Sequence, residues 1–249
     1  KSSVRTRQLP GVSPLVFSRF LLEKTAFLSL SDMGKALPSY EEIPIACRMD
    51  EAVQSEYKRI ENALVQVLRS DRRAAQKILS AYLNLLTVYP DQPYDQKPIL
   101  YPDSDVPIVE PENIGDADTL GEKEQKTLEL VKAAIQNGER ALIYTSWVRT
   151  DSQQKLKKLL ADEGYRTEIL TDKIKTTDRE DWVQKKLAAG MQVLIVNPSL
   201  VETGLDLNAF TTLVFYSMGY KLFTLRQASR RSWRINQKAP AVKVYMLYY

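Results

Sequence analysis

The stretch QVLIVN, residues 192–197, is an uninterrupted run of aliphatic side chains that ends on a polar residue. Three further segments in the C-terminal half have a similar apolar character: RALIYTSW (140–147), TTLVFYS (211–217) and AVKVYMLYY (241–249). Segments with helical spacing of apolar residues lie between them. Short, continuously apolar and β-branched strands are typical of a parallel sheet that is covered on both faces. The alternation of strands and helices therefore predicts an α/β fold with a mostly parallel sheet.

The N-terminal half has a different pattern. Apolar residues at helical spacing predict one helix over 49–69, capped by Asp50, and another over about 72–88. Residues 89–118 are rich in Pro and Asp, and their apolar residues follow neither the helical nor the strand period. This pattern is typical of a linker or a surface loop. We therefore divide the chain into a helical lead-in with its linker, 1–118, and an α/β domain, 119–249.

The composition excludes several kinds of chemistry. The chain has 249 residues, 35 Lys and Arg against 31 Asp and Glu, one cysteine and no histidine. The absence of histidine excludes Ser-His-Asp and Cys-His catalysis and leaves no ordinary zinc site, so we expect no metal site. Cys47 cannot form an intrachain disulfide and is expected to be a small buried residue. No apolar run approaches the ~18 residues of a membrane span, so we expect a cytoplasmic, intracellular protein without a membrane partner.

The stretch RQASRRSWRINQ, 226–237, concentrates arginines in what its spacing predicts to be one helix. With Thr224 as N-cap, Gln227 falls at the third helical position of a T-x-x-Q capping box. Two similar starts, Thr150–Gln153 and Thr177–Glu180, are expected to open helices further upstream. On a period of 3.6 residues one stripe of the helix is polar and another face is small or apolar. The stripe holds Gln227, Arg231 and Arg234; the packing face holds Leu225, Ala228, Ser232 and Ile235.

Polar segments follow the predicted strands. TSWVRT (145–150) and NPSLVETGLDLNAF (197–210) each come directly after a strand, and the arginine stretch follows a third. Ligands of open α/β sheets bind beyond the carboxyl ends of the strands. We therefore expect the three segments to converge on one edge of the sheet.

Taken in this order, the segments resemble motifs of a known family. ALIYTSWVRT (141–150) is similar to motif IV of superfamily-two helicases and translocases, and VLIVNPSLVETGLDL (193–207) is similar to motif V with Swi/Snf spacing. RQASRRSWRINQ resembles motif VI, Q-x-x-x-R-x-x-R-x-G-Q, and LPSYEEIPIACRMDEAVQSEY (37–57) resembles the segment that leaves the first lobe. The resemblance implies a three-layer RecA-like lobe over 119–249, the second of two lobes in an ATP-dependent DNA helicase or translocase, preceded by a helical lead-in.

The resemblance also implies roles for particular residues. In this family the two motif VI arginines reach the γ-phosphate of ATP bound on the other lobe, which identifies Arg231 and Arg234 as the catalytic arginine fingers, with Gln227 sensing the phosphate. Gly204, Asp206 and Gln237 are implied in ATP binding. Motifs IV and V are implied in contacts with the nucleic-acid backbone, through the residues Ser146, Trp147, Arg149, Asn197 and Thr203.

Two positions depart from the family pattern. Asn236 stands where the family commonly has Gly, and Asp206 stands where Swi/Snf members often have Asn. Other superfamily-two branches carry Asp at the second position, so Asp206 stays in the predicted site.

The sequence contains no G-x-x-x-x-G-K-[ST] phosphate loop and no D-E-x-x box, which the family carries on its first lobe. The chain also begins with Lys, so we expect it to be a piece of a longer ATP hydrolase. ATP and Mg²⁺ are then expected to be held mainly by the first lobe, and the fragment alone is expected to be inactive. The expected partners are that first lobe and DNA, duplex or single-stranded.

Simpler interpretations of these residues remain open. The arginines could belong to a solvated helix face. Gly204 could be a glycine that a turn requires, and Asp206 could be a helix cap. Trp147 and Trp233 also fit roles in packing. A non-catalytic nucleic-acid or partner-binding module derived from a helicase lobe is the alternative to a motor lobe.

Overall fold

The structure is a computed structural model that describes residues 12–26, 37–146, 151–201 and 204–249. The chain divides into two units, Lys1–Ala36 and Leu37–Tyr249. The described part of the first unit is a short helical segment: α1 (Pro14–Val16), η1 (Phe17–Leu21) and η2 (Leu22–Lys24). None of the side chains described in this segment is buried.

The second unit is built around a parallel sheet. Its order among the described residues is β1-β8-β7-β4-β6-β5, and each neighbouring pair is parallel. The strands are β1 (Ser39–Ala46), β4 (Ala141–Tyr144), β5 (Thr167–Leu170), β6 (Val193–Val196), β7 (Thr212–Phe215) and β8 (Ala241–Tyr248). The central strands β4, β6 and β7 are buried at every position, as their uninterrupted apolar runs predict.

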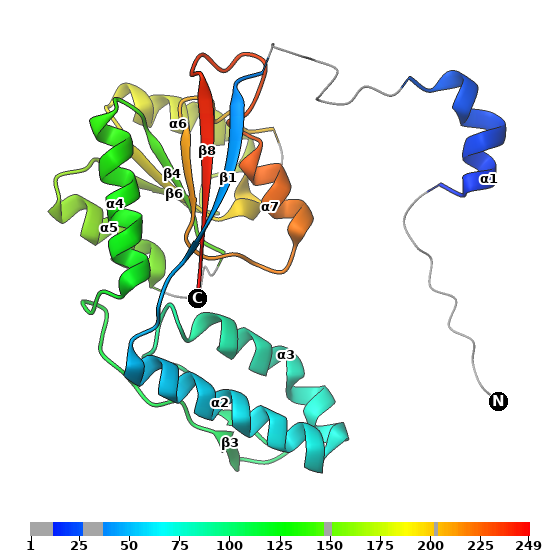
Figure 1. The fold of residues 1–249 in the computed structure, drawn as a ribbon, viewed down its shortest axis with the longest axis vertical. Helices are drawn as coiled ribbons and strands as arrows, with labels where there is room; N and C mark the ends of the chain where they lie inside the picture. Colours follow the sequence, from blue (N-terminus) through cyan, green and yellow to red (C-terminus); the bar gives the residue numbers. More distant parts are fainter. Residues whose placement is uncertain (1–11, 27–36, 147–150, 202–203) are drawn as a thin grey trace. The chain divides into compact units, whose positions relative to one another are not determined.

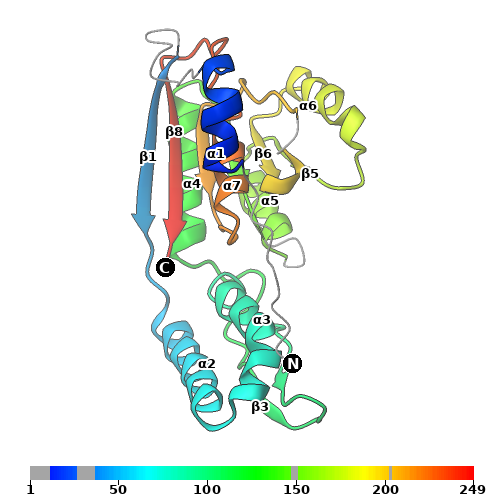
Figure 2. The ribbon, with the colours of Figure 1, turned by 90° about the vertical axis from the view of Figure 1, so that its right-hand side faces the viewer.

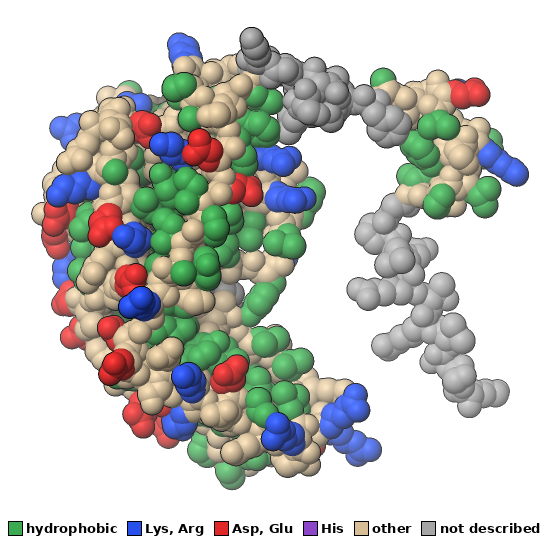
Figure 3. All heavy atoms as spheres, in the orientation of Figure 1, with side chains coloured by type: hydrophobic (Ala, Val, Ile, Leu, Met, Phe, Trp, Pro, Cys, Tyr) green, Lys and Arg blue, Asp and Glu red, His purple; other side chains and the backbone are tan. Residues whose placement is uncertain are grey.

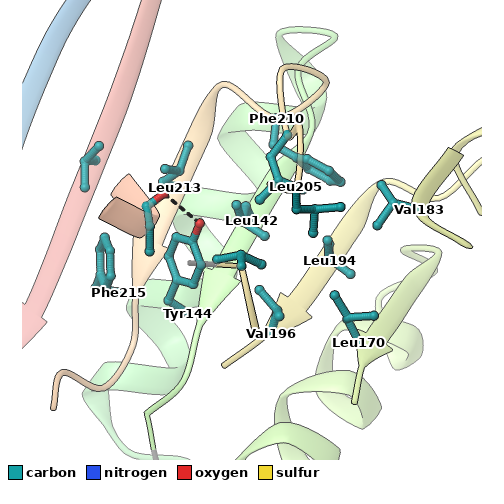
Figure 4. Close-up of a cluster of buried hydrophobic side chains, with 14 of the residues drawn as sticks. Leu142, Tyr144, Leu170, Val183, Leu194, Val196, Leu205, Phe210, Leu213 and Phe215 are labelled. Carbon is teal, nitrogen blue, oxygen red and sulfur yellow. Dashed lines mark hydrogen bonds between the residues drawn. The ribbon is translucent and has the colours of Figure 1, made fainter. Parts of the chain in front are cut away.

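Helices cover both faces of this sheet (Figure 1 and Figure 2). The helices are α4 (Glu122–Gln136), α5 (Ser152–Asp162), α6 (Arg179–Ala188) and α7 (Leu222–Ser229). Successive strand residues point to opposite faces, so Ile143 packs with residues of α4 and α5, while Leu142 packs with residues of α6 and α7. Figure 4 shows the second of these clusters, in which the Tyr144 hydroxyl donates a hydrogen bond of 2.9 Å to the carbonyl oxygen of Ala228. The predicted α/β fold is confirmed.

A pair of helices with its own core precedes the first central strand. Helices α2 (Glu51–Ser70) and α3 (Arg72–Val88) lie within two residues of the predicted ranges. Asp71 ends α2 and caps α3, because its carboxylate accepts hydrogen bonds from the backbone N–H groups of Arg73 and Ala74. The predicted linker contains a short antiparallel hairpin of β2 (Ile99–Leu100) and β3 (Pro107–Val109), which packs on these helices.

Strand β1 lies outside the α/β range predicted from the sequence, 119–249. It pairs with β8 along its whole length, from Ser39 with Ala241 to Ala46 with Tyr248. The buried Cys47, as expected, follows this strand and packs with the core under α4 and α5.

The predicted helix starts need correction at three places. α5 has Asp151 as its N-cap, and Gln153 donates to the Thr145 hydroxyl at 2.7 Å rather than completing a capping box; Thr150 lies outside the described residues. A 3-10 turn, η4 (Thr176–Asp178), precedes α6, so Asp178 and not Thr177 is the N-cap there.

The third correction concerns the arginine stretch. α7 begins at Leu222, with Lys221 as its N-cap, and ends at Ser229. Arg231 and Arg234 therefore follow the helix in a series of turns, and they do not share a helical stripe with Gln227. Ile235, expected on the packing face, is 58% exposed, whereas Ala228 and Ser232 are fully buried as expected.

None of the helices in the described ranges is long and apolar enough to cross a membrane.

Candidate functional site

The turns after α7, residues 230–237, form a compact loop that we call the arginine loop. Hydrogen bonds fix it to residues 197–210, which precede β7 and which we call the motif V segment. The Ser232 hydroxyl donates to the carbonyl oxygen of Leu207 at 3.0 Å, and the Gln237 amide donates to the carbonyl oxygens of Asn208 and Ser232, both at 2.9 Å. Asn208 donates in turn to the Asn236 side chain at 2.7 Å. These hydrogen bonds set the position of the loop. None of them involves Arg231 or Arg234, the two residues that the sequence assigns to catalysis.

Arg231 and Arg234 lie close together on this loop. Both are half-buried, and one guanidinium N–H of Arg234 donates to the carbonyl oxygen of Leu205 at 3.4 Å. Burial and the neighbouring charge of Arg234 lower the pKa of Arg231 from its usual value. An anion close to Arg231 would offset both the burial of this guanidinium group and the nearby charge of Arg234.

The other residues assigned to ATP binding have structural partners here. Asp206 is half-buried, and its carboxylate accepts a hydrogen bond from the backbone N–H of Asn208 at 3.2 Å, as in a local cap. Gly204 has a φ of +74°, a conformation that favours glycine, and it borders a cleft of about 300 Å³ beside the start of α6. Gln237 uses its amide to close the arginine loop. Gln227 is exposed on α7, outside the loop.

A second cluster lies at the carboxyl ends of β4, β6 and β7. The backbone N–H of Ser146 donates to the Ser217 hydroxyl at 2.9 Å, and the Ser146 hydroxyl donates to the carbonyl oxygen of Ser217 at 3.0 Å. Asn197 donates to the carbonyl oxygen of Ser146 at 3.0 Å and accepts from Ser199. The three strand ends are thus joined into one polar edge. Trp147, Arg149 and Thr203, which the sequence assigns to the same contacts, lie outside the described residues.

The prediction that all three segments converge on the carboxyl edge is wrong for the arginine loop. α7 begins at that edge and runs back along the sheet. Its eight residues span about 12 Å, which is close to the ~13 Å length of a four-residue strand, so the helix reaches the opposite edge. The loop therefore emerges near the amino end of β8, which begins at Ala241. The motif V segment, 197–210, connects the two clusters, since it starts at the end of β6 and returns to the start of β7.

Two residues that organise these clusters were absent from the sequence prediction. Ser217 follows β7 in the same way that Ser146 and Asn197 follow their strands. A polar residue directly after an apolar run is therefore the sequence feature that could have predicted its place in this cluster. Asn208 connects the motif V segment to the arginine loop, and the sequence carries no comparable signal for it.

The arginine loop carries three arginines, Arg230, Arg231 and Arg234, and no carboxylate. Among the described residues there is no group of three or more acidic or cysteine side chains placed to hold a metal ion.

Comparison with known proteins relates this arrangement to a family. The helicase conserved C-terminal domain family matches residues 122–236. The search of curated proteins found no match.

Several solved structures share the fold. The C-terminal part of the Fun30 ATPase domain superposes with a TM-score of 0.64 at 13% identity, covering 85% of each chain. The C-terminal domain of the Sulfolobus solfataricus SWI2/SNF2 ATPase gives 0.58 at 16% identity, covering 84% of this chain and 79% of that one. The core of the same ATPase in complex with dsDNA gives 0.62 at 18% identity, covering 85% of this chain but 41% of that one.

The family match covers less than half of the chain, whereas these structural matches cover 84–85% of it. Residues 122–236 match the helicase conserved C-terminal domain family, and the chain has the fold of the C-terminal lobe of Swi2/Snf2 ATPases.

Proposed function

We propose that this chain is the C-terminal motor lobe of an ATP-dependent DNA helicase or translocase, and that its arginine loop completes an ATP site on a first lobe. The observation that carries the proposal is that Arg231 and Arg234 both lie half-buried on a loop whose hydrogen bonds to Leu207 and Asn208 fix its position. Charge that develops on a transferring phosphoryl group needs such cations, and an arginine finger contributes about 10³–10⁵ in rate.

The phosphate loop and the Mg²⁺-binding carboxylates have no counterpart in the sequence, so in this proposal they belong to the first lobe. ATP and Mg²⁺ would be held mainly there, with Asp206, Gly204 and Gln237 beside the arginines and Gln227 near the phosphates. The 249-residue chain alone is then expected to show no measurable ATP hydrolysis.

We assign the polar edge at Ser146 to the nucleic-acid backbone, with the buried Asn197 and Ser217 holding this residue in place. Backbone amides and short polar side chains of this kind contact phosphates without reading sequence. The face over β1, β8 and α4 carries charges of both signs in a mixed pattern and offers no continuous positive surface (Figure 3). One of the structural matches, the Sulfolobus solfataricus SWI2/SNF2 core, is in complex with dsDNA.

The test is the ATPase rate of the full-length protein, measured without DNA and with duplex or single-stranded DNA. A rate that DNA stimulates, together with an inactive 249-residue chain, supports the motor lobe. DNA binding by the full-length protein without any ATP hydrolysis would instead favour a non-catalytic binding module.

A further inference from the structure

We propose that Trp233 is a positioning residue that ties the arginine loop to the residues entering strand β1. This inference rests on the proposed function, since it concerns the placement of Arg231 and Arg234. Trp233 lies between these two arginines in the sequence, and its side chain reaches a part of the chain almost 200 residues away.

The contact of Trp233 with the β1 side is specific. Its indole N–H donates a hydrogen bond of 2.8 Å to the carbonyl oxygen of Pro38. Its ring lies 4.8 Å from the ring of Tyr40, at an interplanar angle of 37°. Both rings are partly buried against the core cluster under α6 and α7, and burial raises the pKa of Tyr40 to about 12. An aromatic pair of this kind contributes about 0.5–1.5 kcal/mol beyond the area that it buries.

The residues that Trp233 contacts are fixed by the sheet. The backbone N–H of Ser39 donates to the carbonyl oxygen of Pro240 at 2.9 Å, and β1 then pairs with β8 over eight residues. The start of β1 is thus a rigid reference point beside the loop, because the loop itself leads into β8.

The arginine loop is therefore held from two sides. On one side Ser232, Asn236 and Gln237 connect it to Leu207 and Asn208. On the other side the described contact is that of Trp233 with Pro38 and Tyr40.

Losing the Trp233 contact would leave the loop fixed on one side only. The loop carries two cations, and the charge of Arg234 disfavours that of Arg231. The guanidinium groups would then be free to move apart, and a displacement of about 1 Å at a catalytic group can cost a hundredfold in rate.

The test compares kcat and KM for ATP in the full-length protein carrying Trp233→Ala, Trp233→Phe or Trp182→Ala. Trp182 is a matched control, since it is also a half-buried tryptophan packed on the same core cluster, but on α6. We expect Trp233→Ala to lower kcat by about tenfold or more with KM changed by less than about twofold, because the ATP-holding lobe is untouched. Trp233→Phe keeps the ring contact with Tyr40 and loses the indole N–H, so its kcat should lie between those of the wild-type protein and Trp233→Ala.

Melting temperatures separate positioning from stability. We expect Trp233→Ala and Trp182→Ala to lower the melting temperature by similar amounts while only Trp233→Ala lowers kcat. If Trp233→Ala and Trp182→Ala lower kcat equally, the positioning role of Trp233 is overturned. It is also overturned if Trp233→Ala keeps the wild-type kcat while Arg231→Ala lowers it. Wild-type kcat in Arg231→Ala itself would instead overturn the proposed function of the loop.

Discussion

Burial and the nearby charge of Arg234 both make the charged form of Arg231 less favourable, and they lower the pKa of its guanidinium group. The loop is therefore less favourable in isolation than with an anion beside it. A strained arrangement of charge like this is common where a ligand relieves it.

Replacing either arginine should therefore affect catalysis more than folding. In the full-length protein we expect Arg231→Ala or Arg234→Ala to lower kcat for ATP hydrolysis by about a hundredfold or more, with little change in melting temperature. Arg231→Lys should restore little, because a point charge cannot bind two oxygens as the planar fork does. Steady-state kinetics and thermal melts of the three variants check this. Normal turnover with a melting temperature lowered by several degrees would show that the arginines are structural.

α7 shows what the sequence predicts about an element and what it misses. Gln227, Arg231 and Arg234 were predicted to share one helical stripe, yet the helix ends at Ser229 and both arginines lie in the turns that follow it. The cause is tertiary: Ser232, Asn236 and Gln237 satisfy their polar groups on the motif V segment, which a continued helix would not allow. Burial of the central strands was readable from their apolar runs alone, but β1, with its half-exposed alternation, was missed.

The corrected end of α7 gives a direct test of packing. Ala228→Asp should lower the melting temperature of the chain by more than about 10 °C, because it places a charge in a fully buried position of the core. Ile235→Asp makes the same charge on the exposed part of the arginine loop and should change stability by less than about 0.5 kcal/mol. Thermal denaturation of both variants decides the matter. A large loss for Ile235→Asp would mean that the helix extends through residue 235.

Helix α2 is tied to the segment after β3 by one buried carboxylate. Glu56 is 5% exposed, and it accepts hydrogen bonds from the Arg59 guanidinium, both at 2.6 Å, and from the backbone N–H of Glu112 at 2.9 Å. Burial alone would raise the pKa of Glu56, but these hydrogen bonds lower it below its usual value. A carboxyl with a lowered folded pKa stabilises the protein above its unfolded pKa, and that stabilisation is lost as pH falls through the folded pKa.

We therefore expect Glu56→Gln to destabilise the chain by about 1.5–3 kcal/mol at pH 7, and by progressively less as the pH falls below about 4. The free energy of unfolding, measured by urea denaturation between pH 7 and pH 3, gives both quantities. Glu61→Gln is the matched control, because Glu61 is exposed on the same helix and should show neither effect. A destabilisation of Glu56→Gln that stays constant with pH would mean that the charge of Glu56 is unimportant.

The helical pair and the α/β lobe share a buried ionic junction in the second unit. Lys123, on α4, pairs at 2.7 Å with Asp91, which follows α3, and the two side chains are 6% and 2% exposed. Next to it, Lys155 pairs with Glu124 at 2.7 Å, and the Tyr216 hydroxyl donates to the same carboxylate at 2.9 Å. A buried ion pair adds little net stability, but removing one partner leaves an unpaired charge that costs about 3–5 kcal/mol. The boundary predicted from composition, at residue 118, separates Asp91 from Lys123.

The fold therefore predicts where this chain can be divided. A protein of residues 37–249 should unfold in a single cooperative transition, since it keeps the ionic junction and all six strands of the described sheet. A protein of residues 119–249 loses β1, exposes the edge of β8, and leaves Lys123 without Asp91, so it should not unfold cooperatively. Circular dichroism melts of the two proteins test this, with Lys123→Met in the shorter one as the control that removes the unpaired cation. Cooperative unfolding of residues 119–249 near the melting temperature of 37–249 would show that the lobe folds independently and that the sequence-based boundary is the better one.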